Sequence, residues 1–284
     1  MTVAVPWQMK LASKVVASNL RIRYSVLRHS GVSKLGAMLR PDYAQDVYGL
    51  HLVHANDSAE TMLEVGPGDS LFTAVFAYGR FKSIDLIDAG DFAVTTPQLY
   101  IDLAESLRNS GECLPNLKKC LSIEEIFSAL NCRYFTNGVA SLANLKDKSV
   151  GFSFSHSVIQ HLPLHEFSTF ARELHRVMTA GGTSSHVVDF KDMLKGSLNH
   201  LRFSERTWES SFLKKCNVYT NRLRISQMIR AFSDEGFDVE VFEQSRWDVL
   251  PLRRAALHEQ FQKMDDDDLL TYGAHLLLRK SASL

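Results

Sequence analysis

Two glycines end a short apolar segment at residues 62–70, Met-Leu-Glu-Val-Gly-Pro-Gly-Asp-Ser. Gly66 and Gly68 have no side chains, so the backbone there can turn sharply from a buried strand into a helix and approach a bound ligand closely. No third glycine follows three residues later, so the segment departs from the dinucleotide fingerprint Gly-x-Gly-x-x-Gly. The spacing therefore indicates a site for a nucleotide-type cofactor. The turn that holds this cofactor differs from the one in dinucleotide-binding proteins.

An acidic side chain ends the next predicted strand. Residues 83–88, Ser-Ile-Asp-Leu-Ile-Asp, follow the turn and finish at Asp88. In a doubly wound sheet, a carboxylate about twenty residues after the turn accepts hydrogen bonds from both ribose hydroxyls. Glu64 gives the turn the form Glu-x-Gly-x-Gly. This pattern resembles motif I of the class I S-adenosylmethionine-dependent methyltransferases.

The resemblance continues in order over roughly residues 60–190. Residues 149–162 are similar to the family's fourth strand and the loop beside the transferred methyl. Residues 172–182 are similar to the helix and Gly-Gly turn that precede its fifth strand, which is expected at residues 183–190. The sequence departs from the family pattern at Val139, where an acid is common, at Gly151 in place of Asp, and at Thr179-Ala180 in place of Lys-Pro.

The resemblance implies that the cofactor is S-adenosylmethionine. It places the methionine end of this donor at the glycine turn, the ribose at Asp88 and the adenine beside residues 138–140. The residues expected to bind the cofactor are Glu64, Gly66, Pro67, Gly68, Asp88, Gly138, Val139, Ala140 and Ser155.

Histidines follow the predicted fourth strand, where the resemblance places the transferred methyl. Methyl transfer is an in-line displacement that depends on alignment and a desolvated path. A hydroxyl acceptor has a high pKa and benefits from a general base, whereas a neutral amine needs only to lose its proton. His161 is the first candidate for this base, with His156 and Asp189 as further catalytic candidates. The alternative for His161 is a structural role, as a helix cap or a hydrogen-bond partner of the backbone.

A metal site is not predicted. His161 and His165 are four residues apart and would share one face of a helix. Pro163 lies between them, and no acidic residues cluster nearby in the sequence.

The charges of the chain balance, with 32 Lys and Arg against 32 Asp and Glu in 284 residues. A balanced chain has no overall field that would recruit nucleic acid. Its 45% hydrophobic content is enough for a full core. The four cysteines lack a Cys-x-x-Cys pair, which fits a reducing compartment, and the apolar runs are too short to cross a bilayer. We therefore predict a cytoplasmic protein without a nucleic-acid partner, whereas a small molecule as its partner is what the resemblance implies.

Residues 1–58 are predicted to form an N-terminal helical extension. Lys and Arg occur throughout residues 1–41, and no acid precedes Asp42. The preferred interpretation is a helix packed over the catalytic domain with a solvated basic face. Peripheral contact with a membrane or an anionic substrate, and a transit peptide, are the alternatives. A second helix is expected from Pro41 to about His54, with Asp42 near its N-cap.

Short apolar strands alternate with amphipathic helices over residues 59–284, which predicts an α/β domain with helices on both faces of a mostly parallel sheet. The resemblance, rather than the periodicity, implies a Rossmann-like seven-stranded sheet in the order 3-2-1-4-5-7-6. A polar stretch at residues 191–221 interrupts the alternation and is expected to form a lid or acceptor-binding wall over the ligand crevice. The candidates for substrate binding are His200, Tyr219, Asn221 and Arg222.

The predicted function is methyl transfer from S-adenosylmethionine to an oxygen of a small molecule, with nitrogen as the second choice. Residues 41–51 and 219–224 resemble segments of bacterial small-molecule or sugar-type methyltransferases. One alternative is a noncatalytic protein that keeps the fold and serves as a partner or scaffold. Another is a nicotinamide-dependent dehydrogenase, which Pro67 and the missing third glycine disfavour. The sequence does not specify the acceptor or the oligomeric state.

Overall fold

The structure is a computed structural model that describes residues 6–19, 36–194, 196–214, 216 and 218–281. Its centre is a seven-stranded sheet. The strands are β1 (Thr61–Val65), β2 (Ser83–Ile87), β3 (Cys132–Phe135), β4 (Val150–His156), β5 (Met178–Asp189), β6 (Phe237–Arg246) and β7 (Thr271–Lys280).

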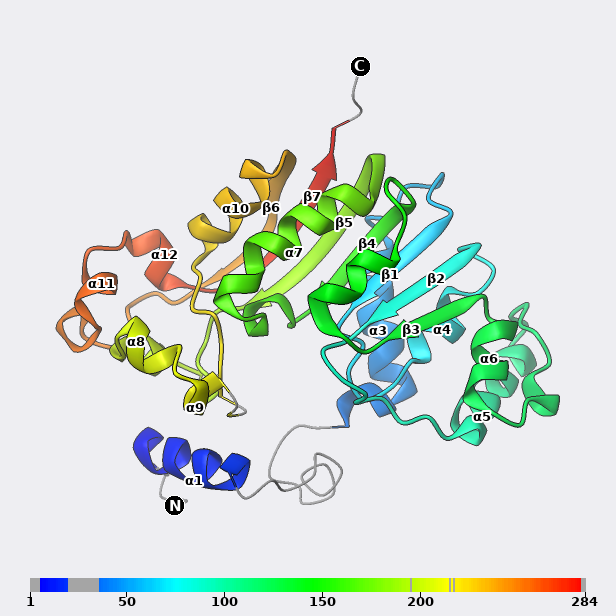
Figure 1. The fold of residues 1–284 in the computed structure, drawn as a ribbon, viewed down its shortest axis with the longest axis horizontal. Coiled ribbons are helices and arrows are strands. Elements are labelled where there is room, and N and C mark those ends of the chain that lie inside the picture. Colours follow the sequence, from blue (N-terminus) through cyan, green and yellow to red (C-terminus); the bar gives the residue numbers. More distant parts are fainter. Residues whose placement is uncertain (1–5, 20–35, 195, 215, 217, 282–284) are drawn as a thin grey trace.

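The strand order is β3-β2-β1-β4-β5-β7-β6, which confirms the predicted topology (Figure 1). The strands from β1 to β5 run parallel to their neighbours, whereas β7 runs antiparallel to both β5 and β6. The chain moves outward from β1 to β3 and then returns to place β4 beside β1. In open α/β sheets, ligands bind beyond the carboxyl ends of the strands at such a reversal. The topology thus places a crevice beyond the ends of β1 and β4.

Helices cover both faces of the sheet, as predicted (Figure 1). The helices α3 (Pro41–Leu52), α4 (Phe72–Ala77), α5 (Pro97–Asn109) and α6 (Ile123–Ala129) contribute to one apolar cluster. The other face is covered by α7 (Leu164–Val177), α10 (Ile225–Asp234) and the short helix η3 (Gly138–Asn144). The remaining helices of the described chain are α1 (Trp7–Asn19), η1 (Ala37–Leu39), η2 (Leu117–Lys119), η4 (Ile159–His161), η5 (Asn199–Arg202), α8 (Glu205–Trp208), α9 (Ser211–Lys214), η6 (Arg254–Ala256), α11 (Glu259–Gln262) and α12 (Asp266–Leu270).

Local sequence signals account for several of these helices. In α7, the buried side chains recur every three or four residues, and this spacing gives one apolar face toward the sheet. The side chain of Ser122 caps α6 by accepting a hydrogen bond from the backbone N–H of Glu125. Pro97 occupies the first turn of α5, where its missing N–H leaves no helical hydrogen bond unmade.

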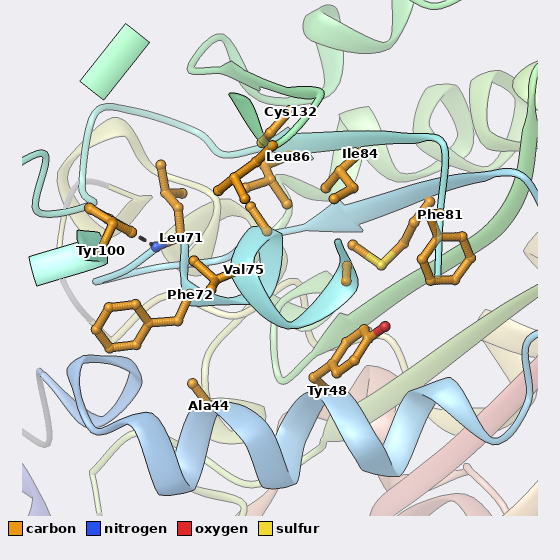
Figure 2. Close-up of a cluster of buried hydrophobic side chains, with 14 of the residues drawn as sticks. Ala44, Tyr48, Leu71, Phe72, Val75, Phe81, Ile84, Leu86, Tyr100 and Cys132 are labelled. Atoms are coloured by element: carbon orange, nitrogen blue, oxygen red, sulfur yellow. Dashed lines mark hydrogen bonds between the residues drawn. The ribbon is translucent and has the colours of Figure 1, made fainter. Parts of the chain in front are cut away.

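The cluster under α3 holds the first half of the sheet in place. Figure 2 shows Ala44 and Tyr48 on α3 lying beside α4, with Ile84 on β2 beyond it. The Tyr100 hydroxyl accepts a hydrogen bond from the backbone N–H of Leu71, at 3.3 Å, just before α4 begins. Because α3 belongs to this core, part of the predicted N-terminal extension is integral to the sheet.

Two predicted boundaries are wrong. The fifth strand, expected to begin at residue 183 after the Gly-Gly turn, begins at Met178, directly after α7 ends at Val177. The register between β4 and β5 shifts here, so the two glycines lie in an irregular part of β5 and Gly181 has φ 73°. Asp42 is not the N-cap of α3, because Pro41 already occupies the first turn and the cap position belongs to Arg40. The Asp42 carboxylate instead pairs with the Arg40 guanidinium at 2.6 Å.

Residues 191–221 form a small apolar core of their own rather than an open loop. Trp208 is fully buried at its centre, and its indole N–H donates to the carbonyl of Thr220 at 2.7 Å. The side chains of Trp7, Leu11 and Val15 on α1 pack against the same cluster. This contact supports the interpretation that the basic helix packs over the domain; residues 20–35 of the predicted extension lie outside the described residues. None of the helices in the described part combines the length and apolar composition that a bilayer-crossing segment needs.

Candidate functional site

A cavity of about 790 Å³ opens at the carboxyl ends of β1, β2 and β4, where the topology predicts the crevice. Its volume lies within the range of small-molecule pockets, roughly 300–1,000 Å³. The wall combines residues of the strand ends with residues of η1, α3 and the 191–221 segment. A second hollow, of about 460 Å³, lies beside α5 and contains none of the predicted site residues. The larger cavity is therefore the candidate site.

The glycine turn forms the floor of this cavity. Gly66 and Gly68 have φ values of 80° and 72°, in the left-handed region that side chains disfavour. A Cβ atom on Gly66 would lie 2.4 Å from a methyl carbon of Val158, whereas one on Gly68 would meet nothing within 4 Å. Gly66 is thus required for the packing of the loop after β4, and Gly68 leaves space at the cavity.

The carboxyl group of Glu64 is buried at the end of β1 and lines the cavity. Its Oε2 atom has no hydrogen-bond partner within the described residues. Burial raises the pKa of Glu64 to about 8, with a smaller contribution from the charge of Asp88, while the Thr73 hydroxyl opposes the shift. A buried carboxyl without a partner is costly unless a ligand supplies a donor or a positive charge.

Asp88 follows β2 and fixes the glycine turn. Its two carboxylate oxygens accept hydrogen bonds from the backbone N–H groups of Gly68, at 3.0 Å, and Ala89, at 2.7 Å. Burial raises the pKa of Asp88 to about 6, which these two hydrogen bonds oppose. Each oxygen retains a further lone pair, so the group can also accept from ligand hydroxyls in the cavity.

The segment predicted beside the adenine is only partly at the cavity. Gly138 and Val139 line the cavity, and the Gly138 N–H donates to the carbonyl of Asp88 at 2.8 Å. Ala140 is exposed and lies outside the lining. Ser155 also lies outside it; its hydroxyl bonds His186 Nδ1, at 2.7 Å, on the α7 and α10 face of the sheet. Ala140 and Ser155, which were predicted to bind the cofactor, therefore do not line the cavity.

His161 ends η4 and lines the cavity. Its Nδ1 lies 2.8 Å from the carbonyl oxygen of Tyr219. Because a carbonyl can only accept, Nδ1 carries the proton and Nε2 keeps its lone pair. The ring is surrounded by protein but exposes surface to the cavity; burial lowers its pKa, while the Tyr219 carbonyl and the charge of Asp189 act in the opposite direction. The geometry is that of a neutral imidazole with a free base nitrogen.

The other two catalytic candidates differ in position. His156 ends β4 and lines the cavity, and its Nδ1 lies 3.2 Å from Nε2 of His51 on α3. Asp189 lies outside the cavity lining and pairs with Lys191 Nζ at 3.1 Å. It can act on the cavity only through its charge, by raising the pKa of His161.

Of the four predicted acceptor-binding residues, only Tyr219 lines the cavity. Its hydroxyl already donates to Glu209, at 3.1 Å, and accepts from the backbone N–H of Leu164, at 3.0 Å. His200, Asn221 and Arg222 lie outside the lining and are buried in the protein. The amide of Asn221 donates to the Ile159 carbonyl at 2.9 Å, and the guanidinium of Arg222 donates to the Phe203 carbonyl at 2.7 Å. The side chains of Asn221 and Arg222 thus attach the 191–221 segment to neighbouring backbone and do not line the cavity.

Sequence reasoning missed much of the cavity wall, including residues before the glycine turn. Ser70 Oγ donates to the Met38 carbonyl, and Gly36 N–H donates to the Asp69 carboxylate, each at 2.5 Å. Residues 36–38 therefore lie over the glycine turn. One available signal was Asn137, which directly precedes the predicted adenine segment. The lining residues that were not predicted include Met38, Tyr43, Val47, Asn137, Leu142, Val158, Phe170, Met193, Lys214 and Cys216.

Comparisons with known proteins show likeness in structure and none in sequence. No protein-family model and no curated protein matches the chain. The YcgJ protein of Bacillus subtilis is 14% identical over 84% of this chain and 100% of that chain, with a TM-score of 0.48. A SAM-dependent methyltransferase of Methanosarcina mazei is 16% identical over 81% of this chain and 96% of that chain, with a TM-score of 0.47. Phosphoethanolamine N-methyltransferase 2 of Haemonchus contortus, in complex with phosphomonomethylethanolamine and S-adenosylhomocysteine, is 13% identical over 99% of this chain and 61% of that chain, with a TM-score of 0.46. At these values the likeness concerns the fold alone.

Proposed function

We propose that this chain, whose sheet has the strand order of the class I methyltransferases, transfers a methyl group from S-adenosylmethionine to an oxygen of a small molecule. The observation that supports this most strongly is the buried carboxyl of Glu64 beside Asp88 at one end of the cavity, one of whose oxygens, Oε2, has no hydrogen-bond partner within the described residues. An ammonium group and a pair of ribose hydroxyls are the ligands that complement these two carboxyls. S-Adenosylmethionine carries both.

The residues present fit this donor. Glu64 pairs with its ammonium group, the glycine turn leaves space for its methionine end, and Asp88 accepts from the ribose hydroxyls. Val139 and Leu142 supply an apolar wall for the adenine. When bound, the donor supplies an electrophilic methyl on a sulfonium. The part the protein plays is to align the acceptor and keep water from the path.

His161 is the base in this proposal. Its Nδ1–H is held by the Tyr219 carbonyl, so Nε2 is available to take the proton of an acceptor hydroxyl. Its lowered pKa keeps the ring neutral near pH 7 and therefore ready to accept. Oxygen is preferred over nitrogen as the acceptor because a hydroxyl needs such a base more than a neutral amine does.

The test is to incubate cell extract with the purified protein and isotope-labelled donor, and to identify the labelled product by mass spectrometry. We expect one labelled small molecule that forms only with the active protein. His161→Ala should lower the rate about 10²-fold or more, in the range of general bases. His165→Ala is the matched control, because His165 lies outside the cavity lining and pairs with Glu166 at the surface.

The scaffold alternative makes a different prediction in the same experiment. A noncatalytic protein with this fold would bind the donor and yield no labelled product. Turnover that His161→Ala leaves unchanged at every pH would keep the methyltransferase but remove His161 as its base.

A further inference from the structure

A chain of hydrogen bonds leads from the cavity into the protein on the α3 side of the sheet. It begins at His156, which lines the cavity and whose Nδ1 lies 3.2 Å from Nε2 of His51. His51 Nδ1 lies 2.7 Å from the hydroxyl of Ser185 on β5. The same hydroxyl lies 2.7 Å from Nε2 of His275 on β7. Four side chains from four elements are thus linked end to end.

The surroundings keep these rings fixed and neutral. His51 is fully buried and stacks on Phe154, with ring centroids 4.8 Å apart. Burial, with repulsion from the neighbouring histidines, lowers the pKa of His51 to about 2 and that of His275 to about 4. The described residues include no group of three or more His, Cys, Asp or Glu that could hold a metal ion. Hydrogen bonding is therefore what this arrangement provides.

Donor and acceptor rules allow this chain two complete arrangements. In the first, His156, His51 and His275 all carry their proton on Nδ1, and Ser185 donates toward His275. In the second, all three rings carry it on Nε2, and Ser185 donates toward His51. Any other set of neutral rings leaves a buried nitrogen without a donor, leaves the Ser185 proton without an acceptor in the chain, or sets the N–H groups of His156 and His51 against each other. The three tautomers are therefore coupled.

We propose that His51, Ser185 and His275 form a proton relay that connects the cavity nitrogen of His156 to His275 on β7, along the same face of the sheet. This rests on the proposed function, in which methyl transfer to a hydroxyl releases one proton in the cavity. His161 takes this proton first and gives it up again to the cavity, where His156, which lines the same cavity, binds it at Nε2 and passes its own Nδ1 proton to His51. His51 passes its own Nδ1 proton to Ser185, and Ser185 passes its proton to His275. His275 releases one proton from Nδ1, so the charge balances and no buried imidazolium persists.

The outer end of the relay leads toward solvent. The ring of His275 stands edge-on to that of His54, with centroids 4.9 Å apart. His54 is partly exposed; burial lowers its pKa, and the negative charge of the exposed Glu240 opposes this shift. The outer end of the relay thus lies beside a histidine that reaches solvent. His161 has no such path, because its Nδ1 proton is held by a backbone carbonyl.

The first test needs neither donor nor acceptor. NMR of isotope-labelled imidazole nitrogens reports which nitrogen of each ring carries the proton. We expect His51, His156 and His275 to share one tautomer in the wild-type protein. Ser185→Ala should free His275 from this coupling, and Ser184→Ala should not. Ser184 is the matched control, since it is equally buried on the same strand but bonds His186 on the other face.

Different tautomers among the three rings of the wild-type protein would overturn the proposal. A Ser185→Ala variant whose His275 signals match the wild type would do the same. His275→Asn, which breaks only the outer link, is a second variant to use if Ser185→Ala does not fold. This readout is independent of methyl transfer, so it separates a failure of the relay from a failure of the proposed function.

The second test measures methyl transfer from the labelled donor to the acceptor molecules in cell extract. Ser185→Ala should lower kcat about 10²-fold, at unchanged KM, and reduce the solvent deuterium isotope effect. Ser184→Ala should retain the wild-type rate and isotope effect. Wild-type turnover in Ser185→Ala contradicts the relay even if His161→Ala is inactive.

Discussion

Glu64 and Asp88 end neighbouring parallel strands and bring two carboxyl groups to the same end of one cavity, near enough for the charge of Asp88 to raise the pKa of Glu64. Within the described residues, neither carboxyl forms an ion pair with a Lys or Arg side chain. Two buried acids without a cation are costly in an empty protein. This arrangement is expected where a ligand brings the positive charge.

Replacing Glu64 by Gln should stabilise the empty protein more at alkaline pH than at acidic pH. The pKa of Glu64 is raised to about 8 in the folded state, from its ordinary value of 4.5, which applies to the unfolded chain. Between these values the unfolded chain releases a proton that the folded chain retains, so Glu64 lowers stability as pH rises, by about 1.4 kcal/mol per unit. Urea unfolding at pH 5 and pH 8 measures the difference. Glu60→Gln, at an exposed surface pair with Lys82, is the control. An equal effect of Glu64→Gln at both pH values contradicts the raised pKa.

Donor binding should release a proton near pH 7. The empty site holds Glu64 largely protonated, and the ammonium group of the donor favours its carboxylate form. Calorimetry in buffers of different ionisation enthalpy should therefore detect the release of about one proton per molecule bound. Glu64→Gln should abolish the release. A binding enthalpy that does not depend on the buffer would show that Glu64 is already ionised.

Gly66→Ala should destabilise the fold more than Gly79→Ala. Both glycines have φ near 80°, so each alanine has a backbone cost of about 1–2 kcal/mol. Only the new methyl at Gly66 collides with Val158, which adds about 1–3 kcal/mol, since nothing lies within 4 Å at Gly79. Thermal unfolding of both variants provides the comparison. The double variant Gly66→Ala with Val158→Ala should recover to the level of Gly79→Ala, and failure to recover would rule out the collision.

Replacing His186 should make the protein less sensitive to mild acid. Burial lowers the pKa of His186 to about 3, so the folded state keeps this ring neutral while the unfolded chain protonates it below about pH 6.5. The stability contributed above pH 6.5 is lost as pH falls, by about 1.4 kcal/mol per unit. The difference in unfolding free energy between wild type and His186→Asn is measured at pH 6.5 and at pH 5. We expect this difference to change by about 1.4 kcal/mol for each pH unit between them. A constant difference would mean that His186 is protonated in the fold.

The parts of the site that lie in strands and glycine turns were predictable from the sequence. Alternating apolar runs locate the strands, and parallel strands carry Glu64, Gly66 and Asp88 to one edge in a fixed order. The strand order itself needed the family resemblance, because the periodicity is the same for several orders.

The acceptor side could not be predicted in the same way. Whether a polar residue in an irregular segment faces a cavity depends on long-range packing. Asn221 and Arg222 look like ligand-binding residues in the sequence, yet they hold the carbonyls of Ile159 and Phe203. Ser155 likewise looks like a cofactor contact in the sequence, yet its hydroxyl bonds His186 within the core. The histidine chain joins residues more than 100 positions apart, which no local pattern reveals.

Calorimetric titration of the purified chain with S-adenosylmethionine and S-adenosylhomocysteine tests the central claim most directly. The account predicts saturable binding of one molecule per chain, weakened roughly 10- to 100-fold by Glu64→Gln, the loss expected for a hydrogen bond to a charged group. The absence of binding by either compound to the folded wild-type protein would contradict it.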